Sequence, residues 1–129
     1  MRGWGMGIWG KRMAMLAMIL VGLLGLLHVY ILVMEMLLWE TPRVRKVFGT
    51  SAEFAASTKS MAANQGLYNG FLAAGLFWGL WQGEAGRDVV AFFLICIVVA
   101  GVYDAITVSR RIFFVQALPA ILALGAMAV

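Results

Sequence analysis

The sequence predicts an all-α membrane protein, built as an antiparallel bundle of four transmembrane helices. Of its 129 residues, 64% are hydrophobic and only 12% are charged, whereas soluble domains are nearer half apolar and a quarter charged. Short polar or basic segments also divide the chain into four apolar runs, each long enough to cross the ~30 Å hydrocarbon core of a bilayer. The length suits a single integral membrane domain that covers residues 1–129.

The first predicted span covers residues 13–39. It is too long for the apolar region of a signal peptide, and no small-residue cleavage site follows it. Pro42 prevents simple continuation of the helix, and the basic residues after it require water or lipid headgroups. The first membrane helix is therefore expected to end before Pro42.

The second predicted helix begins at Ser51, because Thr50 and Glu53 have the spacing of a capping box. It is expected to continue to Gln82, which gives a length of about 48 Å at ~1.5 Å per residue. That length exceeds the hydrocarbon core, so residues 51–60 are predicted to be interfacial and residues 61–82 to form the second span.

The remaining spans are predicted at residues 88–107 and 112–129. The short polar turn before the third span indicates that the second and third helices pack side by side. In the fourth span, Pro119 removes the hydrogen bond to the carbonyl of Val115, and a kink is expected there.

The charges of the chain concentrate where the apolar runs end. The net charge is +4, but no basic surface is long enough to follow the phosphate backbone of a nucleic acid. The predicted partner is therefore a lipid bilayer, and binding of nucleic acid is not expected. The predicted helices place residues 40–60 and 108–111 on one side of the membrane. That side carries six basic residues and the opposite side carries four, which favours the side with six as the cytoplasmic one. The single cysteine, Cys96, excludes an internal disulfide.

Polar residues recur at one depth in all four predicted helices. Glu35, Asp104 and Gln116 each lie three or four residues inside an apolar run, counted from the face that carries residues 40–60. The second helix adds a cluster at the same level, formed by Asn64, Gln65, Tyr68 and Asn69. Unmatched polar groups are costly in lipid, so these side chains are expected to face one another. They predict a polar chamber in one half of the bundle and are its candidate ligand-binding residues.

Glu35 and His28 are the candidate catalytic residues, because an ionisable side chain inside an apolar run indicates a functional site. They share a helix face but lie about 10 Å apart along the axis, which excludes a direct hydrogen bond. A relay through water or a ligand stays open, as does a neutral Glu35 that only holds helices together. One histidine and separated carboxyl groups lack the spacing of a metal site, and no cofactor is predicted.

Glycines at four-residue spacing favour close helix packing. One pair is Gly66 and Gly70, and a series follows at Gly75, Gly79 and Gly83. Such faces bring helices together within a chain or between the copies of a homo-oligomer.

Three segments, residues 28–49, 62–80 and 99–124, resemble a family of small bacterial integral membrane proteins catalogued as a domain of unknown function. The resemblance covers nearly the whole chain beyond residue 20 and implies four helices in the bacterial plasma (inner) membrane. Asp104 departs from the pattern, since similar proteins have glycine there, and this separates it from a shared site. The family's pattern corresponds here to His28, Glu35, Trp39, Asn64, Gln65, Tyr68, Asn69, Gln116 and Pro119.

The family brings no activity with it, so function is inferred from the polar residues. The leading hypothesis is binding of a small amphipathic or lipid-like molecule in the chamber around Glu35. A proton-transfer enzyme acting on a lipid in the manner of an isomerase, a proton-coupled exporter and a structural subunit without ligand are the alternatives.

Overall fold

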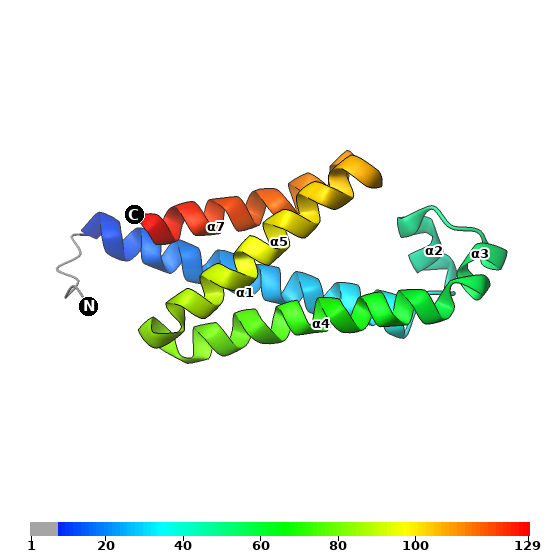
Figure 1. The fold of residues 1–129 in the computed structure, drawn as a ribbon, viewed down its shortest axis with the longest axis horizontal. Helices are drawn as coiled ribbons and strands as arrows, with labels where there is room; N and C mark the ends of the chain where they lie inside the picture. The colour runs from blue at the N-terminus through cyan, green and yellow to red at the C-terminus, as the bar shows by residue number, and fades with distance from the viewer. Residues whose placement is uncertain (1–7) are drawn as a thin grey trace. The chain divides into compact units, whose positions relative to one another are not determined.

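The computed structural model describes the backbone of residues 8–129 and the side chains from Lys11 onward. No strand occurs in this part of the chain, and the all-α prediction is confirmed for it (Figure 1). The helices are α1 (Ile8–Met36), α2 (Pro42–Phe48), α3 (Ala52–Ser57), α4 (Lys59–Trp81), η1 (Gly83–Gly86), α5 (Arg87–Thr107), α6 (Arg110–Ile112), η2 (Phe113–Ala117) and α7 (Leu118–Ala128).

Among the described residues, three helical segments are long and apolar enough to cross a membrane: Lys11–Met36, Gly83–Thr107 and Arg110–Ala128. Their length and composition indicate a membrane protein. Helix α4, with 23 residues, falls within the range of lengths of these three segments, but the polar side chains of its first half lower its hydropathy.

The chain divides into two compact units, one formed by Gly25–Ala74 and the other by the chain up to Leu24 with Gly75–Val129. In the first unit, the end of α1 packs closely against α4 at two glycines. A Cβ atom at Gly66 would lie 3.0 Å from Glu35 Cβ, and one at Gly70 would lie 2.5 Å from Leu32 Cδ1. Helices α2 and α3 lie at the end of this unit where α1 stops and α4 begins (Figure 1).

The segment after Pro42 folds into the short helix α2. Thr41 is its N-cap and accepts a hydrogen bond from the Val44 N–H at 3.5 Å, while Pro42 occupies the first turn, where its missing N–H costs little. Gly49 ends the helix with a φ of 68°, a conformation that favours glycine. Both caps are visible in the sequence as a Thr-Pro start and a glycine stop.

The continuous helix expected from Ser51 to Gln82 is interrupted at Thr58. The capping box expected from Thr50 is also displaced, because Ser51 is the N-cap and its Oγ accepts from the Phe54 N–H at 3.1 Å. Thr58 ends α3 by donating its hydroxyl to the Phe54 carbonyl at 2.7 Å. A side chain that bonds the backbone in this way competes with helix continuation.

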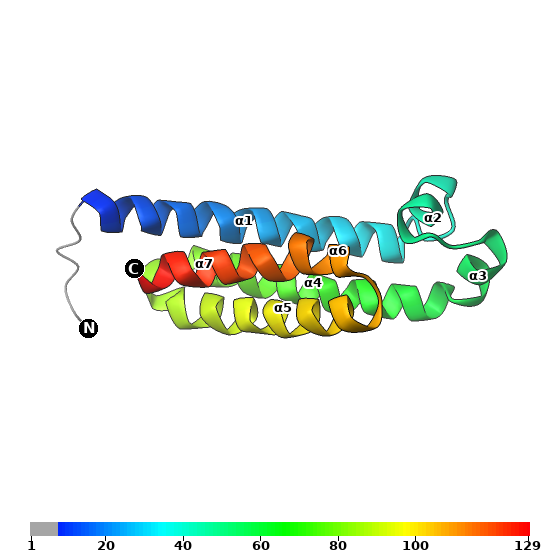
Figure 2. The same ribbon diagram turned by 90° about the horizontal axis from the view of Figure 1, so that it is seen from above.

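In the second unit, α7 runs beside α5 in the opposite direction (Figure 2). Leu76, Leu94 and Ile97 are fully buried in this unit, and Gly101 of α5 lies directly against Ala117. A kink is expected at Pro119, and the structure has the π-helical turn η2 immediately before α7, which carries Pro119 in its first turn. A wider turn accommodates a proline ring and its missing donor.

The glycine series of α4 is used within the chain. A Cβ atom at Gly75 would lie 2.4 Å from the ring of Phe93, and one at Gly79 would lie 2.5 Å from Val90 Cγ2. Gly83 differs from both, because its φ is 65° and a methyl group there would meet no other part of the chain within 4 Å. Its role is to form the turn after α4, and it does not belong to the packing face.

Candidate functional site

The central feature of the first unit is a partly buried hydrogen bond between α1 and α4. Glu35 is in the last turn of α1 and only 3% exposed, and its Oε1 accepts from Asn69 Nδ2 at 2.8 Å. Gly66 makes this contact possible, because the absence of a side chain lets the backbone of α4 approach Glu35. Asn69, three residues further on, lies on the same helix face. Asn69 also donates to the carbonyl of Gln65 at 3.1 Å, which orients its amide.

His28 lies two turns before Glu35 on α1 and is 1% exposed. His28 and Glu35 are the polar side chains that are buried in the part of the chain described by the structure. Their seven-residue separation places them on one helix face, about 10 Å apart. Any proton exchange between them therefore requires an intervening molecule.

The four polar residues expected to line one chamber do not all lie on the same face of α4. The buried stripe of α4 in this unit runs through Ala62, Gly66 and Ala73, and Asn69 lies beside it. Asn64 and Tyr68 lie off this stripe and are exposed.

Each exposed member of the cluster has local contacts. Asn64 donates to the Ser60 carbonyl at 3.0 Å. Tyr68 is 65% exposed and packs edge-on against Phe71, with ring centroids 5.8 Å apart. Gln65 is also exposed, and its carbonyl receives the Asn69 amide. Of the four residues, Asn69 is the one that contacts Glu35.

Asp104 and Gln116 belong to the second unit, and both are half-buried. The backbone carbonyl of Asp104 accepts from the N–H groups of Val108 and Ser109, at 2.7 Å and 3.1 Å, at the end of α5. Among the described residues, Asp104 forms no ion pair with Arg111, although the two share a helix face in the sequence. The intervening chain leaves the helical path at Val108, so the four-residue periodicity is lost. Gln116 lies in the π-helical turn η2.

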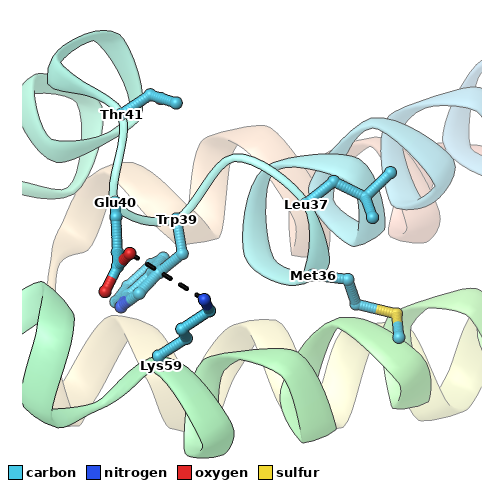
Figure 3. Close-up of a pocket in the computed structure, with 6 residues that line it drawn as sticks. All are labelled: Met36, Leu37, Trp39, Glu40, Thr41 and Lys59. Carbon is cyan, nitrogen blue, oxygen red and sulfur yellow. Dashed lines mark ion pairs between the residues drawn. The ribbon is translucent and has the colours of Figure 1, made fainter.

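An open pocket of about 280 Å³ adjoins the end of α1 (Figure 3). Glu40 and Lys59 point toward each other across it, with the carboxylate Oε2 and the ammonium Nζ 3.9 Å apart. Both side chains are largely solvent-exposed, so this ion pair contributes little to stability. The pocket combines apolar and polar groups: Met36, Leu37, Trp39, Glu40, Thr41 and Lys59.

Trp39, which lines this pocket, is fixed by two contacts. Its Nε1 donates to Thr58 Oγ1 at 3.1 Å, and its ring contacts that of Phe48, with centroids 5.0 Å apart. The sequence pattern did not single out Glu40 or Lys59 as site residues. Their opposite charges at the end of one helix and the start of its antiparallel neighbour are the signal that could have identified them.

Comparisons with known proteins give one family and one similar protein. Residues 22–128 match the family described as "Protein of unknown function (DUF1304)". The chain is 31% identical over 114 residues to "Uncharacterized protein YpaA" of Lactococcus lactis subsp. lactis (strain IL1403). This alignment covers 87% of the present chain and 96% of that protein. No solved structure matches the chain. In the described residues, no group of three or more histidine, cysteine or acidic side chains is placed to hold a metal ion. From both comparisons, the chain therefore belongs to the DUF1304 family of proteins of unknown function.

Proposed function

We propose that the protein is an antiparallel four-helix bundle of the bacterial plasma (inner) membrane, with α4 as the additional span. At ~1.5 Å per residue, the 23 residues of α4 extend about 34 Å, which is enough for the ~30 Å hydrocarbon core. The amides of Asn64 and Asn69 have hydrogen-bond partners within the chain, which lowers the cost of placing them in lipid. Large apolar side chains exposed along α4 would contact lipid tails: Leu67, Phe71, Phe77, Trp78 and Trp81.

Within this bundle, the unit Gly25–Ala74 binds a small amphipathic or lipid-like molecule around Glu35. The observation that carries this proposal is the buried Glu35 carboxyl group, oriented by the Asn69 amide. A buried ionisable group is costly and could be replaced by an apolar residue if packing were its purpose. An acidic group held at a defined position, with His28 buried on the same face, suits recognition of the polar end of a ligand.

The open pocket at the end of α1 supports a ligand of limited size and mixed polarity, although Glu35 itself does not line it. Met36 and Leu37, which directly follow Glu35, provide apolar contacts, while Glu40 and Lys59 provide opposite charges. Its volume of about 280 Å³ is slightly below the ~300–1,000 Å³ typical of small-molecule sites. The pocket therefore suits a headgroup-sized polar moiety, with the apolar part of the molecule in the surrounding lipid.

Mass spectrometry of the purified protein, under conditions that preserve bound lipids, tests this proposal. The wild-type chain should retain a co-purified molecule that Glu35→Gln loses. The glutamine side chain can still accept a hydrogen bond from Asn69, so the thermal midpoint should change little. Glu53→Gln, at an exposed residue of α3, is the matched control and should retain the molecule.

The outcome also separates ligand binding from the other functions. If Glu35→Gln lowers the thermal midpoint and neither protein carries a bound molecule, Glu35 is structural and the proposal fails. Proton-coupled flux in liposomes that disappears in Glu35→Gln would identify an exporter. Conversion of the bound molecule to an isomer would identify a proton-transfer enzyme.

A further inference from the structure

Helices α2 and α3 carry an exposed surface that combines basic and apolar side chains. The apolar members are Val47, Phe48 and Phe54, which are 60%, 40% and 53% exposed. The basic members, Arg43 and Lys46, are also exposed. We call these five residues the α2–α3 surface; it is separate from Glu35 and from the residues that line the pocket.

The orientation of α2 is determined by packing on one side. Val44 is 2% exposed, and Phe48 is held by its ring contact with Trp39. At 100° per residue, Val47 and Phe48 flank Val44, while Arg43 borders Val47 and Lys46 lies on the opposite side of the helix. The helix is therefore amphipathic, and its apolar stripe is only partly covered by the rest of the unit.

This surface lies at the end of the unit where α1 stops and α4 begins (Figure 1). Since α1 is long and apolar enough to cross a membrane, its end marks the level of the lipid headgroups. Between Thr41 and Thr58 there are three basic residues and one acidic residue, a net charge of +2. Among the described residues, no ion pair involves Arg43 or Lys46, so the chain itself does not neutralise these two side chains.

We propose that the α2–α3 surface docks onto an anionic lipid bilayer, with the apolar side chains in the interfacial region and the basic side chains at the headgroups. Short amphipathic helices with basic residues bind membranes in this way. A second copy of the chain is a poorer occupant. A two-fold interface would bring together two copies of the same positively charged surface, and three apolar side chains fall short of the ~800 Å² per partner of a stable interface.

Fluorescence quenching of the full chain in liposomes tests the docking. In a Cys96→Ala background, Val47→Cys is labelled with an environment-sensitive dye and reconstituted in phosphatidylcholine alone or mixed with phosphatidylglycerol. If the surface docks, the dye should be protected from quenching by aqueous iodide and should be quenched by lipids spin-labelled near the headgroup. Both effects should be stronger in liposomes that contain phosphatidylglycerol. Arg43→Gln/Lys46→Gln should lower the docked-to-undocked ratio by roughly fivefold for each charge removed.

Arg110→Gln/Arg111→Gln is the matched control, because it removes two exposed basic residues from α6 and should leave the protection at Val47 unchanged. The proposal is overturned if iodide reaches the dye equally in both lipid mixtures. It is also overturned if the two double variants reduce protection equally, since net charge alone would then explain the effect. If protection of the dye rises with the protein-to-lipid ratio and does not depend on phosphatidylglycerol, the occupant of the α2–α3 surface is a second copy of the chain, and the proposal is overturned.

Discussion

Asn69 Nδ2 of α4 donates a 2.8 Å hydrogen bond to Glu35 Oε1 of α1, and the carboxyl group that accepts it is buried. The contact joins residues 34 positions apart in the chain and depends on the close approach of α4 at Gly66. It makes the stability of the unit Gly25–Ala74 sensitive to changes on either helix.

Asn69→Ala should destabilise the protein by about 1–3 kcal/mol, because it removes a hydrogen-bond donor from a buried carboxyl group. Thermal unfolding in detergent, followed by circular dichroism, measures the change. Asn64→Ala is the control, since Asn64 is exposed and bonds only the backbone of its own helix among the contacts observed. Equal losses in the two variants would show that the bond to Glu35 adds nothing to stability.

Gly66→Ala should destabilise more than Gly70→Ala. A methyl group at Gly66 would lie 3.0 Å from Glu35 Cβ and 3.2 Å from the Leu32 carbonyl oxygen, neither of which can rotate away. At Gly70 the close atom is Leu32 Cδ1, the end of a flexible side chain. We expect a cost of about 1–3 kcal/mol at Gly66 and a much smaller one at Gly70.

The control for both glycine variants is Gly22→Ala in α1, where the new methyl group would meet nothing within 4 Å beyond its chain neighbours and the adjacent backbone of its own helix. Alanine is the better helix former, so this variant should be neutral or more stable by roughly 0.5–1 kcal/mol. Thermal midpoints of the three variants in the same detergent give the ranking. The reverse order at Gly66 and Gly70 would contradict the observed approach of α1 and α4.

Gly101→Ala should destabilise the second unit by about 1–3 kcal/mol through overpacking. The new methyl group would lie 2.9 Å from Ala117 Cβ and 3.0 Å from the Ala117 nitrogen, at the π-helical turn. Gly125→Ala in α7 has open space around it and serves as the control. Hydrogen exchange of residues 113–117 should accelerate in Gly101→Ala alone, and unchanged exchange would show that α5 does not support this turn.

Trp39 and Thr58 should show a coupling energy of about 0.5–1.5 kcal/mol in a double-mutant cycle. Trp39→Phe removes the Nε1 donor and keeps an aromatic ring against Phe48, while Thr58→Val removes the hydroxyl acceptor and keeps its shape. The stabilities of the single and double variants, measured by thermal unfolding, give the coupling. Additive losses would mean that the 3.1 Å hydrogen bond makes no net contribution.

Local chemistry allowed much of the secondary structure to be predicted. The third span was expected at residues 88–107 and α5 is Arg87–Thr107, because charges and polar residues limit an apolar run at both ends. The start of α3 was predicted one residue early, since Thr50 and Ser51 are both good N-caps and the sequence does not distinguish them. The interruption at Thr58 was missed because it depends on where a hydroxyl finds its partner.

Local patterns in the amino-acid sequence were enough to predict the all-helical fold, three of the apolar helices and the burial of His28 and Glu35. Hydropathy and helix-ending residues act over a few positions, so their effects can be read along the chain. Only the tertiary structure decided that Asn69, and not Asn64 or Tyr68, meets Glu35. That choice depends on which face of α4 packs against α1. The close contact at Gly66 sets the rotation of α4 about its axis, and it thereby joins residues 34 positions apart in the chain.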